Sequence, residues 1–564
     1  MISLARFRPK LLDTLAAGYG REQFGKDVAA GITVAFVALP LAMAFGIASG
    51  VTPAQGIATS VVAGFLISLL GGSRVQIGGP AGAFVALLYT IAERHGVANL
   101  LLATMMAGGL LLAMGLFKLG NLIRFIPVAI IVGFTNGIAV VIALQQVRDF
   151  LGLPIEKMPA NFLSQMAELW RHAGGVNAAA VAIGVASLAT VVMWPKSYLP
   201  NHGRARRWMA KLPGTVVVLV LATAVVALAG LPVETIGSRF GDIPRGLPPL
   251  AVPAFDWTAA QTLVMPAVSI ALLCAIESLL CARVADGLID DRHDPNQELM
   301  AQGVANMAAP LFGGIAATGT IARTVTNARA GAVSPVAGMV HAATLLLVVV
   351  VLAPLARHVP LAALAGILLF VAWNMGEWRA FGRLSRMSGS YRVTMLATFA
   401  LTVLFDVNIA VQVGLLIACL AFIFRISAHS GVEPIRLTAD LAHPAPGRRV
   451  AAWQLSGSLF FGSIDKIESL LDPTHALPDV VVLDMHRLID LDASGLEALE
   501  SLHARLVRAG GHLIVAEPSP QPLQKMTRTG FLESLGPDGM FDELEDALAA
   551  ARAIAARLGT EATA

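Results

Sequence analysis

Long uncharged, hydrophobic runs are the dominant pattern along this chain. They recur from residue 28 to residue 424, and the longest, 28–73, is long enough for two helices. A helix needs roughly 20 apolar residues to cross the hydrocarbon core of a bilayer. With breaks at Gly and Pro taken as boundaries, we predict about fourteen membrane segments. These lie near 28–47, 53–71, 80–94, 98–117, 125–146, 176–194, 213–230, 262–283, 298–312, 320–333, 335–354, 360–375, 391–405 and 408–427.

A different pattern begins near residue 440. The stretches "RRVAAWQL", "DVVVLDM" and "GHLIVAE" are short apolar runs of the kind that form buried strands. Residues 493–510 instead carry apolar positions at helical spacing, and Asp492 before them is a suitable N-cap. Strands that alternate with helices indicate an α/β domain of roughly 110 residues.

Composition and charge separate the same two parts. The chain is 56% hydrophobic and 14% charged, with a mean hydropathy of +0.72, which is too apolar for a soluble protein of 564 residues. Residues 1–428 carry 29 Lys and Arg against 18 Asp and Glu, whereas residues 429–564 carry 11 against 19. We predict a leader over 1–27, an all-α polytopic membrane domain over 28–428, and a linker and α/β domain over 429–564.

Basic residues also predict the orientation in the membrane. The N-terminal stretch "MISLARFRPKLLDTL" lacks the apolar core of a cleavable signal and is typical of a cytoplasmic amphipathic leader. The loops 196–211 and 376–392 are both rich in Lys and Arg, and the segment count puts both on the side of the N-terminus. The positive-inside rule then predicts a multi-pass protein of the inner (plasma) membrane, with the N- and C-termini in the cytoplasm.

Several functional classes find no support in the sequence. The three cysteines lie in apolar runs, so we expect no disulfide framework, and we expect no metal or cofactor. We find no combination of nucleophile and base, which argues against an enzyme. We also find no basic patch interleaved with aromatic residues, which argues against nucleic-acid binding.

Two Gly-rich breaks precede unusually short membrane segments. The first break is "LLGGSRVQIGGPAGAF" (69–84) and the second is "LFGGIAATGTIAR" (311–323). They precede the third and the tenth segment, which hold matching positions if the domain consists of two halves of seven. Paired interrupted segments are typical of transporters with inverted repeats and a binding site at mid-membrane. The alternative is that these glycines only allow close helix packing.

Arg323 lies at the start of the tenth segment, among residues that favour lipid. A helix that starts near the bilayer centre presents free backbone N–H groups and the positive end of its dipole there. Helix N-termini bind anions for this reason, and Arg323 adds a full positive charge. We therefore predict an anion site, since a negatively charged substrate would offset the cost of the buried charge. The alternative is a permanent ion pair between Arg323 and Glu277.

Glu277 is the only acid that we assign to a confident membrane span. Intramembrane carboxylates mark ion or proton pathways, and burial favours the protonated form. Cys281 follows one helical turn later and is a poor ligand for a hard cation such as sodium. This favours proton coupling over sodium coupling.

Four motifs and the C-terminal domain resemble the SulP (sulfate permease) family of anion transporters with a STAS domain. The motifs are "VALPLAMAFGIASG" (37–50), "GGSRVQIGGPAGAF" (71–84), "IESLLCARVAD" (276–286) and "ATGTIARTVTNARAGAVSPVAG" (317–338). The resemblance implies a 7+7 inverted repeat, with a moving core domain against a gate domain and an anion site between segments 1, 3, 8 and 10. Carried over, the substrate-binding residues are Leu41, Phe45, Ala81, Gly82, Ala322 and Arg323, with Glu277 for the coupling ion.

The resemblance also leaves open which anion is carried. Many members have a polar residue where Leu41 and Ala81 stand, and those thought to use sodium have Asp in place of Glu277. Sulfate with proton coupling is our main hypothesis, and the alternatives are sodium-coupled bicarbonate or a proton-coupled C4-dicarboxylate such as fumarate or succinate. An alternative of another class is a membrane-anchored signalling protein that senses an anion.

Two further expectations concern the STAS domain and assembly. Ser494 matches the serine that is phosphorylated in STAS-like anti-sigma antagonists, although it could simply occupy the first turn of a helix. We expect a homodimer and a cytoplasmic partner of the STAS domain.

Overall fold

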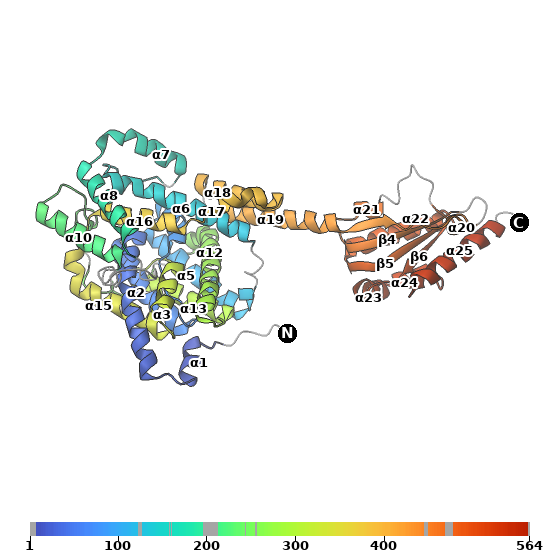
Figure 1. Cartoon of the computed structure of the whole chain (residues 1–564), viewed down its shortest axis with the longest axis horizontal. Helices are drawn as coiled ribbons and strands as arrows, with labels where there is room; N and C mark the ends of the chain where they lie inside the picture. The colour runs from blue at the N-terminus through green and yellow to red at the C-terminus, as the bar shows by residue number, and fades with distance from the viewer. Residues whose placement is uncertain are drawn as a thin grey trace. The chain divides into compact units, whose positions relative to one another are not determined.

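The computed structural model describes residues 7–121, 127–156, 158–159, 161–195, 213–242, 244–253, 256–405, 407–444, 449–468 and 478–561. The chain divides into two compact units, Met1–Leu415 and Leu416–Ala564 (Figure 1). The basic loop predicted over 196–211 lies outside the described residues.

The first unit is almost entirely helical, and each predicted membrane segment overlaps one of its helices. The helices are α1 (Lys10–Ala16), α2 (Arg21–Ala48), α3 (Pro53–Leu70), α4 (Val85–His95), α5 (Val97–Leu116), α6 (Val128–Leu151), α7 (Phe162–Arg171), α8 (Ala178–Met193), α10 (Gly214–Ala229), α11 (Ile236–Phe240), α12 (Trp257–Ile289), α13 (Pro295–Ala308), α14 (Ile321–Arg329), α15 (Val336–Ala356), α16 (Leu361–Met375), α17 (Arg379–Arg383), α18 (Gly389–Leu404) and α19 (Val407–His429), the last of which continues into the second unit.

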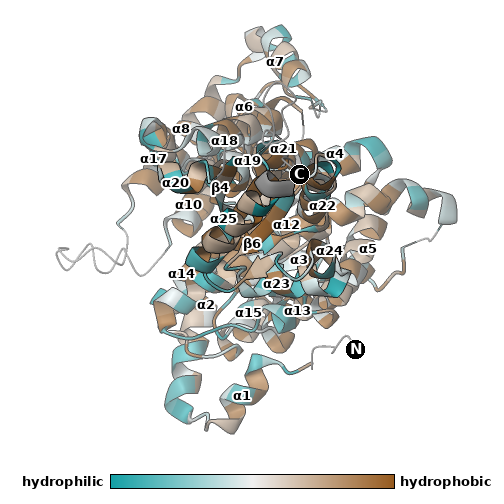
Figure 2. Cartoon of the chain, turned by 90° about the vertical axis from the view of Figure 1, so that its right-hand side faces the viewer, coloured by the Kyte–Doolittle hydropathy of each residue, from teal (hydrophilic) through white to brown (hydrophobic). Residues whose placement is uncertain are grey.

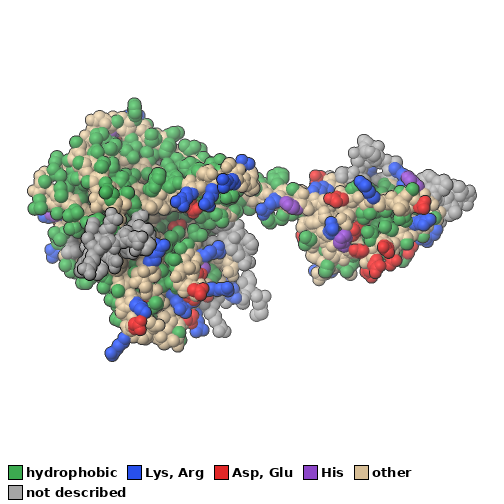
Figure 3. Space-filling model, in the orientation of Figure 1, with side chains coloured by type: hydrophobic (Ala, Val, Ile, Leu, Met, Phe, Trp, Pro, Cys, Tyr) green, Lys and Arg blue, Asp and Glu red, His purple; other side chains and the backbone are tan. Residues whose placement is uncertain are grey.

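The length and composition of these helices fit a membrane domain. Seven stretches among the described residues are long and apolar enough to span a bilayer, and three shorter apolar helices accompany them. Figure 3 shows that hydrophobic side chains cover much of the outer surface of this unit. Large apolar side chains such as Met193 and Leu228 are at least 80% exposed, which fits contact with lipid better than contact with water.

Small residues allow the closest helix contacts in this unit. A Cβ atom added at Gly56 in α3 would lie 2.1 Å from the backbone carbonyl oxygen of Ala42 in α2. A Cβ atom at Gly108 in α5 would likewise lie 2.7 Å from the carbonyl oxygen of Gly303 in α13. Glycine at these positions lets the backbones approach directly, as is typical of helix packing in membranes.

The second unit contains a five-stranded mixed sheet in the order β3-β4-β5-β6-β7. Strand β3 pairs antiparallel with β4, whereas β4, β5, β6 and β7 are parallel. The strands are β3 (Gly431–Pro434), β4 (Val450–Leu459), β5 (Val480–Leu491), β6 (His512–Ala516) and β7 (Met540–Phe541), and the helices are α20 (Ala439–Ala442), α21 (Asp465–Glu468), α22 (Ala493–Arg508), α23 (Pro520–Thr529), α24 (Phe531–Leu535) and α25 (Leu544–Glu561).

Alternation along the strands gives this sheet two apolar faces. Val481 and Leu483 of β5 pack into a core that includes α22, α23 and α24, whereas Val480 and Val482 pack into a second core with α25. Figure 2 shows the hydrophobic colouring of β6 beneath α25. A parallel sheet covered on both faces explains why these strands are continuous apolar runs.

The predicted α/β elements of the second unit are confirmed. Strands β4, β5 and β6 coincide with the three apolar runs, and α22 covers most of 493–510. Asp492 is the N-cap, because its Oδ1 accepts a hydrogen bond of 2.7 Å from the backbone N–H of Gly495. The predicted limits of the domains at residues 27 and 428 stay predictions.

Asp484 in β5 is a buried carboxylate whose hydrogen bonds decide its charge. Burial alone would raise the pKa of Asp484, but hydrogen bonds from Gln454 and from the backbone and ring of His486 outweigh burial and hold the pKa below its usual value. Because the pKa is lowered in the folded state, these bonds stabilise the fold at pH values above the pKa of Asp in the unfolded chain. That stabilisation is lost as the pH falls through the lowered value.

The division into two units predicts that the membrane unit folds without the sheet. We expect a chain that ends at His429, before β3, to stay monodisperse in detergent with an unchanged melting temperature, because each unit has its own core. Size-exclusion chromatography and thermal unfolding check this. As a control, a chain that ends at Leu491 exposes the edge of β5 and should aggregate. Aggregation of the shorter chain as well would show that the units depend on each other.

Candidate functional site

The two Gly-rich breaks meet inside the first unit. Strand β1 (Gly78–Gly79) of the first break pairs antiparallel with β2 (Thr318–Gly319) of the second break, with Gly78 opposite Gly319 and Gly79 opposite Thr318. The backbone N–H and the hydroxyl of Thr320 both donate to the carbonyl oxygen of Ile77, at 2.8 and 3.0 Å. The segments that start after the two breaks are therefore brought together at their N-terminal ends.

Helical structure begins directly after each strand. A 3-10 turn, η1 (Gly82–Phe84), leads into α4, and α14 starts at Ile321. Both helix starts carry backbone N–H groups that have no partner within their own helix. Both helix starts lie close to the β1–β2 ladder, and each favours a small anion near its free N–H groups.

Arg323 projects from the first turn of α14 across the first break and is only 1% exposed. Its Nη1 donates to Ser60 Oγ of α3 at 3.3 Å, and its Nη2 donates to the carbonyl oxygen of Pro80 at 3.4 Å. In the part of the chain that the structure describes, no carboxylate oxygen lies within 4.0 Å of this guanidinium. The permanent ion pair with Glu277 is therefore not formed in this structure.

The glycines of the breaks make room for these side chains. A Cβ atom at Gly79, where φ is +153°, would lie 2.4 Å from Nη1 of Arg323. A Cβ atom at Gly319 would lie 1.7 Å from Nε2 of Gln76, a residue of the first break. Each break thus carries a side chain that passes over a glycine of the other break. Close packing, the alternative interpretation of these glycines, is therefore present at the breaks, and the binding site stays a prediction.

Apolar side chains surround the start of the first helix. A Cβ atom at Gly82 would lie 3.3 Å from Phe45 of α2, 3.3 Å from Met375 of α16 and 3.4 Å from Ile142 of α6. The structure therefore brings Phe45 and Gly82 together, as expected, whereas no sequence signal pointed to Met375 or Ile142. The other expected site residues are Leu41 and Ala81, which are 5% and 6% exposed, and Ala322, which is exposed in the first turn of α14.

Glu277 is half-buried in the middle of α12. One turn before it, the carbonyl oxygen of Cys274 accepts a hydrogen bond from the Thr318 hydroxyl at 3.2 Å, and one turn after it, the Cys281 thiol donates to Thr324 Oγ1 at 3.2 Å. Glu277 therefore lies at the level of β2 and the first turn of α14. It has no ion pair or hydrogen bond with any residue that the structure describes.

Glu277 is not the only acid within the fold of the helical unit, because two further carboxylates are buried there. Glu298 at the start of α13 is completely buried and accepts hydrogen bonds from Ser278 Oγ at 3.0 Å, Gln302 Nε2 at 2.8 Å and the Gly72 N–H at 3.0 Å. Such bonds allow a carboxylate to be buried. The signal was present, because Glu298 is the first residue of the predicted segment 298–312.

A second buried acid, Asp27, was assigned to the leader. It is completely buried in α2 and accepts hydrogen bonds from the N–H groups of Val333 and Ser334, at 2.8 and 3.2 Å, and from the Tyr19 hydroxyl at 2.7 Å. Asp27 thereby ties the start of α2 to the connection between α14 and α15. Figure 2 shows hydrophilic turns at the end of α2 that adjoins α1.

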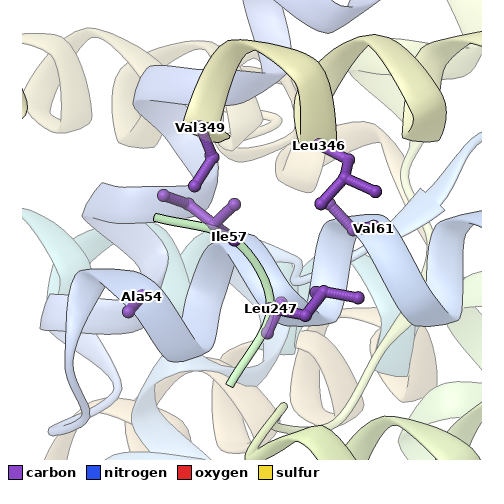
Figure 4. A pocket seen from close by; sticks show the side chains of 8 residues that line it. Ala54, Ile57, Val61, Leu247, Leu346 and Val349 are labelled. Atoms are coloured by element: carbon purple, nitrogen blue, oxygen red, sulfur yellow. The ribbon is translucent and has the colours of Figure 1, made fainter. Parts of the chain in front are cut away.

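Two cavities in the first unit do not include Arg323 or Glu277. One, of about 10 Å³, is lined by apolar side chains of α3 and α15 and by Leu247, so it offers no charge to an anion (Figure 4). The other, of about 510 Å³, lies at the C-terminal ends of α2, α4 and α6 and is lined by charged residues of both signs, among them Glu93, Arg148 and Arg239.

Ser494 is half-buried in the first turn of α22, two residues after the N-cap Asp492. This position fits the structural role that any serine can play at a helix start. Its phosphorylation stays a prediction.

Comparison with known proteins covers both units. The model of the sulfate permease family matches residues 24–398, and the STAS domain model matches residues 448–547. The "Putative sulfate transporter YvdB" of Bacillus subtilis is 44% identical over 94% of this chain and 98% of its own length. The "Bicarbonate transporter BicA" of a Picosynechococcus strain is 28% identical over 93% of this chain and 94% of its own length.

Two solved structures have a similar fold. The transmembrane domain of a cyanobacterial bicarbonate transporter BicA covers 70% of this chain and 98% of its own length, at 31% identity and a TM-score of 0.61. The murine Solute Carrier 26 family member A9 anion transporter, in its inward-facing state, shares the fold over 97% of this chain and 94% of its own, at 17% identity and a TM-score of 0.84.

The helical unit therefore has the fold of multi-pass anion transporters, and the unit that follows has a mixed sheet with helices on both faces. Since the family model matches well over half of the residues, the chain belongs to the sulfate permease family, whose members are membrane anion transporters and not enzymes, and it carries a STAS domain after the membrane unit.

Proposed function

We propose that this protein is a secondary active transporter that moves a small oxyanion, sulfate first, across the inner membrane. The observation that carries the proposal is the buried guanidinium of Arg323, which has no carboxylate partner among the described residues and donates to the carbonyl oxygen of Pro80, just before the first helix start. A charge at the bilayer centre costs roughly 2.5–3.5 kcal/mol on insertion scales. A bound anion would offset that cost.

The surroundings of the site support a small anion that is recognised mainly by charge. The three side chains nearest Gly82, those of Phe45, Ile142 and Met375, offer no hydrogen-bond donor, which leaves Arg323 and backbone N–H groups as the donors that we propose for the substrate. Sulfate is the anion in the name of a relative that is 44% identical. Bicarbonate is the second candidate, favoured by the BicA transmembrane domain, which is 31% identical. A C4-dicarboxylate is a further substrate to test.

Proton coupling through Glu277 is part of the proposal. Glu277 lies at the level of the site and has no partner in the described part of the chain, so it is available to bind and release a proton. Sodium would need oxygen ligands there. The Thr324 hydroxyl already accepts from the Ile77 N–H at 2.9 Å and from Cys281, and the Thr318 hydroxyl donates to a backbone carbonyl. These engagements favour a proton over sodium.

Further parts of the proposal concern architecture and regulation. They are a 7+7 inverted repeat, cytoplasmic termini, a homodimer, a cytoplasmic partner of the STAS domain and phosphorylation at Ser494. Basic side chains line the segment around α17, which orientation by positive charge places in the cytoplasm (Figure 3). An anion-sensing signalling protein would bind the anion without net transport, so flux measurements separate the two functions.

Replacing Arg323 should abolish transport without unfolding the protein. In Arg323→Ala, we expect anion affinity to fall roughly 10- to 100-fold, because a charge-assisted hydrogen-bond donor is lost. The melting temperature should not fall, since the variant removes a buried charge that has no carboxylate partner. Uptake of labelled sulfate and bicarbonate into proteoliposomes, with thermal unfolding, measures both effects. Arg329→Ala, an exposed position on the same helix, is the control. Wild-type affinity and flux in Arg323→Ala would refute the anion site.

A methyl group beside Arg323 should have a similar effect without changing any charge. In Gly79→Ala, the new Cβ atom would lie 2.4 Å from Nη1 of Arg323 and would therefore displace the guanidinium. We expect anion affinity to fall about tenfold or more, which corresponds to about 1.4 kcal/mol. The control is Gly109→Ala, where a Cβ meets no atom within 4 Å. Equal affinities for these two variants would show that the position of Arg323 does not matter.

Glu277→Gln should separate transport from its driving force. The amide mimics the protonated acid and cannot release a proton, so we expect the variant to lose uptake driven by a pH gradient but to retain anion exchange. Wild-type uptake should rise as the external pH falls and should not need sodium. Uptake into liposomes under imposed pH and sodium gradients tests this, with Glu22→Gln at the exposed start of α2 as control. Wild-type uptake that follows sodium and ignores pH would overturn proton coupling.

A further inference from the structure

Three metal-ligating side chains converge in the STAS domain, away from any role in anion binding. Asp484 and His486 belong to β5, and Glu517 follows β6 directly. One potential ligand atom from each residue lies within 4.8 Å of the ligand atoms of the other two. The Asp484 side chain is 1% exposed, whereas those of His486 and Glu517 are 41% and 35% exposed, so the group opens to solvent on one side.

The strand register explains this convergence. Asp484 pairs with Ala516 across the parallel β5 and β6 strands, so the next residue, Glu517, lies beside the residues that follow Asp484. Glu517 is held there, because its N–H donates to the carbonyl oxygen of Phe541 at 3.0 Å and its Oε1 accepts from the Leu544 N–H at 2.9 Å. The second carboxylate oxygen of Glu517 remains directed to His486.

The distances are close to those of a metal site. His486 Nδ1 lies 2.8 Å from Asp484 Oδ1 and 4.0 Å from Glu517 Oε2. Zn²⁺ binds nitrogen and oxygen ligands at roughly 2.0–2.2 Å, which places tetrahedral ligands roughly 3.4 Å from one another. The two distances from His486 Nδ1 lie on either side of this value, and the ligand atoms of Asp484 and Glu517 lie within 4.8 Å of each other. The group offers two carboxylates and one imidazole nitrogen, which are ligand types that Zn²⁺ binds.

We propose that Asp484, His486 and Glu517 form a Zn²⁺ site in the STAS domain, with water in the open position. The imidazole nitrogen selects zinc over magnesium and calcium, which prefer oxygen ligands alone. Gln454 Nε2 donates to Asp484 Oδ2 at 3.0 Å and the Leu544 N–H donates to Glu517, so both carboxylates are oriented by hydrogen bonds behind them. The bound ion would connect β5, the end of β6 and the start of α25.

Zinc binding to the full-length protein tests the proposal. The purified, chelator-stripped protein, without a histidine tag, is dialysed against Zn²⁺ in detergent, and the bound metal is counted for wild type, His486→Ala and Glu517→Gln. We expect each variant to bind one zinc fewer, or to bind this zinc more than about tenfold more weakly. The control is His512→Ala, at an exposed position of the same domain, which should bind as the wild type does.

Cobalt supplies a readout that reports ligand geometry. Co²⁺ in the site should show the visible ligand-field absorption of a four- or five-coordinate ion, and this absorption should disappear in both ligand variants but persist in His512→Ala. Thermal unfolding checks that both ligand variants remain folded. Zinc stoichiometry and cobalt spectra that are identical in all four proteins would overturn the proposal. They would identify the group as a histidine hydrogen-bonded between two carboxylates.

Discussion

Backbone groups at a break in a buried helix must find hydrogen-bond partners, because lipid hydrocarbon and apolar side chains supply none. Here the two breaks supply partners to each other through the ladder between β1 and β2. Side chains form hydrogen bonds with further backbone groups of the breaks that the ladder does not pair. Asn306 accepts from the Ala317 N–H at 2.8 Å and donates to the Ala317 carbonyl oxygen at 2.9 Å, and Asn327 donates to the carbonyl oxygen of Val75 at 2.9 Å. These bonds allow both helices to start inside the buried part of the helical unit.

The same polar interior holds the neighbouring helices in place. Ser278 of α12 links Gln76 of the first break, at 2.9 Å, to Glu298 of α13, which in turn binds the N–H of Gly72. These bonds join α12, α13 and the first break into one network. Because buried networks are costly when partly satisfied, the arrangement favours a single position for the break. Arg323 then has a fixed backbone to lie against, which is what an anion site requires.

The sequence predicted helices well and side-chain contacts poorly, and the physical reasons differ. Apolar runs of helical length and Gly-rich breaks are local patterns, so the helices of the first unit and the special role of 69–84 and 311–323 could be read directly. Arg323 could be found because a cation among apolar residues needs an explanation. Ile142 and Met375 could not be found, because they reach Gly82 only through tertiary packing of ordinary apolar helices. Glu298 was overlooked because a charge at the end of a run is usually interfacial.

The packing around Gly82 differs in kind from the hydrogen bonds between the two breaks. Side-chain atoms of Phe45, Ile142 and Met375 all lie 3.3–3.4 Å from the position that a Cβ atom at Gly82 would take, and the three residues come from different helices. Apolar contacts are not directional, so such surfaces can slide past one another without leaving a polar group unsatisfied. The breaks, by contrast, are joined by a hydrogen-bonded ladder. Hydrogen bonds therefore fix the backbone beside Arg323, whereas the packing at Gly82 depends on the sizes of side chains from three helices, so a change of size there would alter the packing without breaking a hydrogen bond of the ladder.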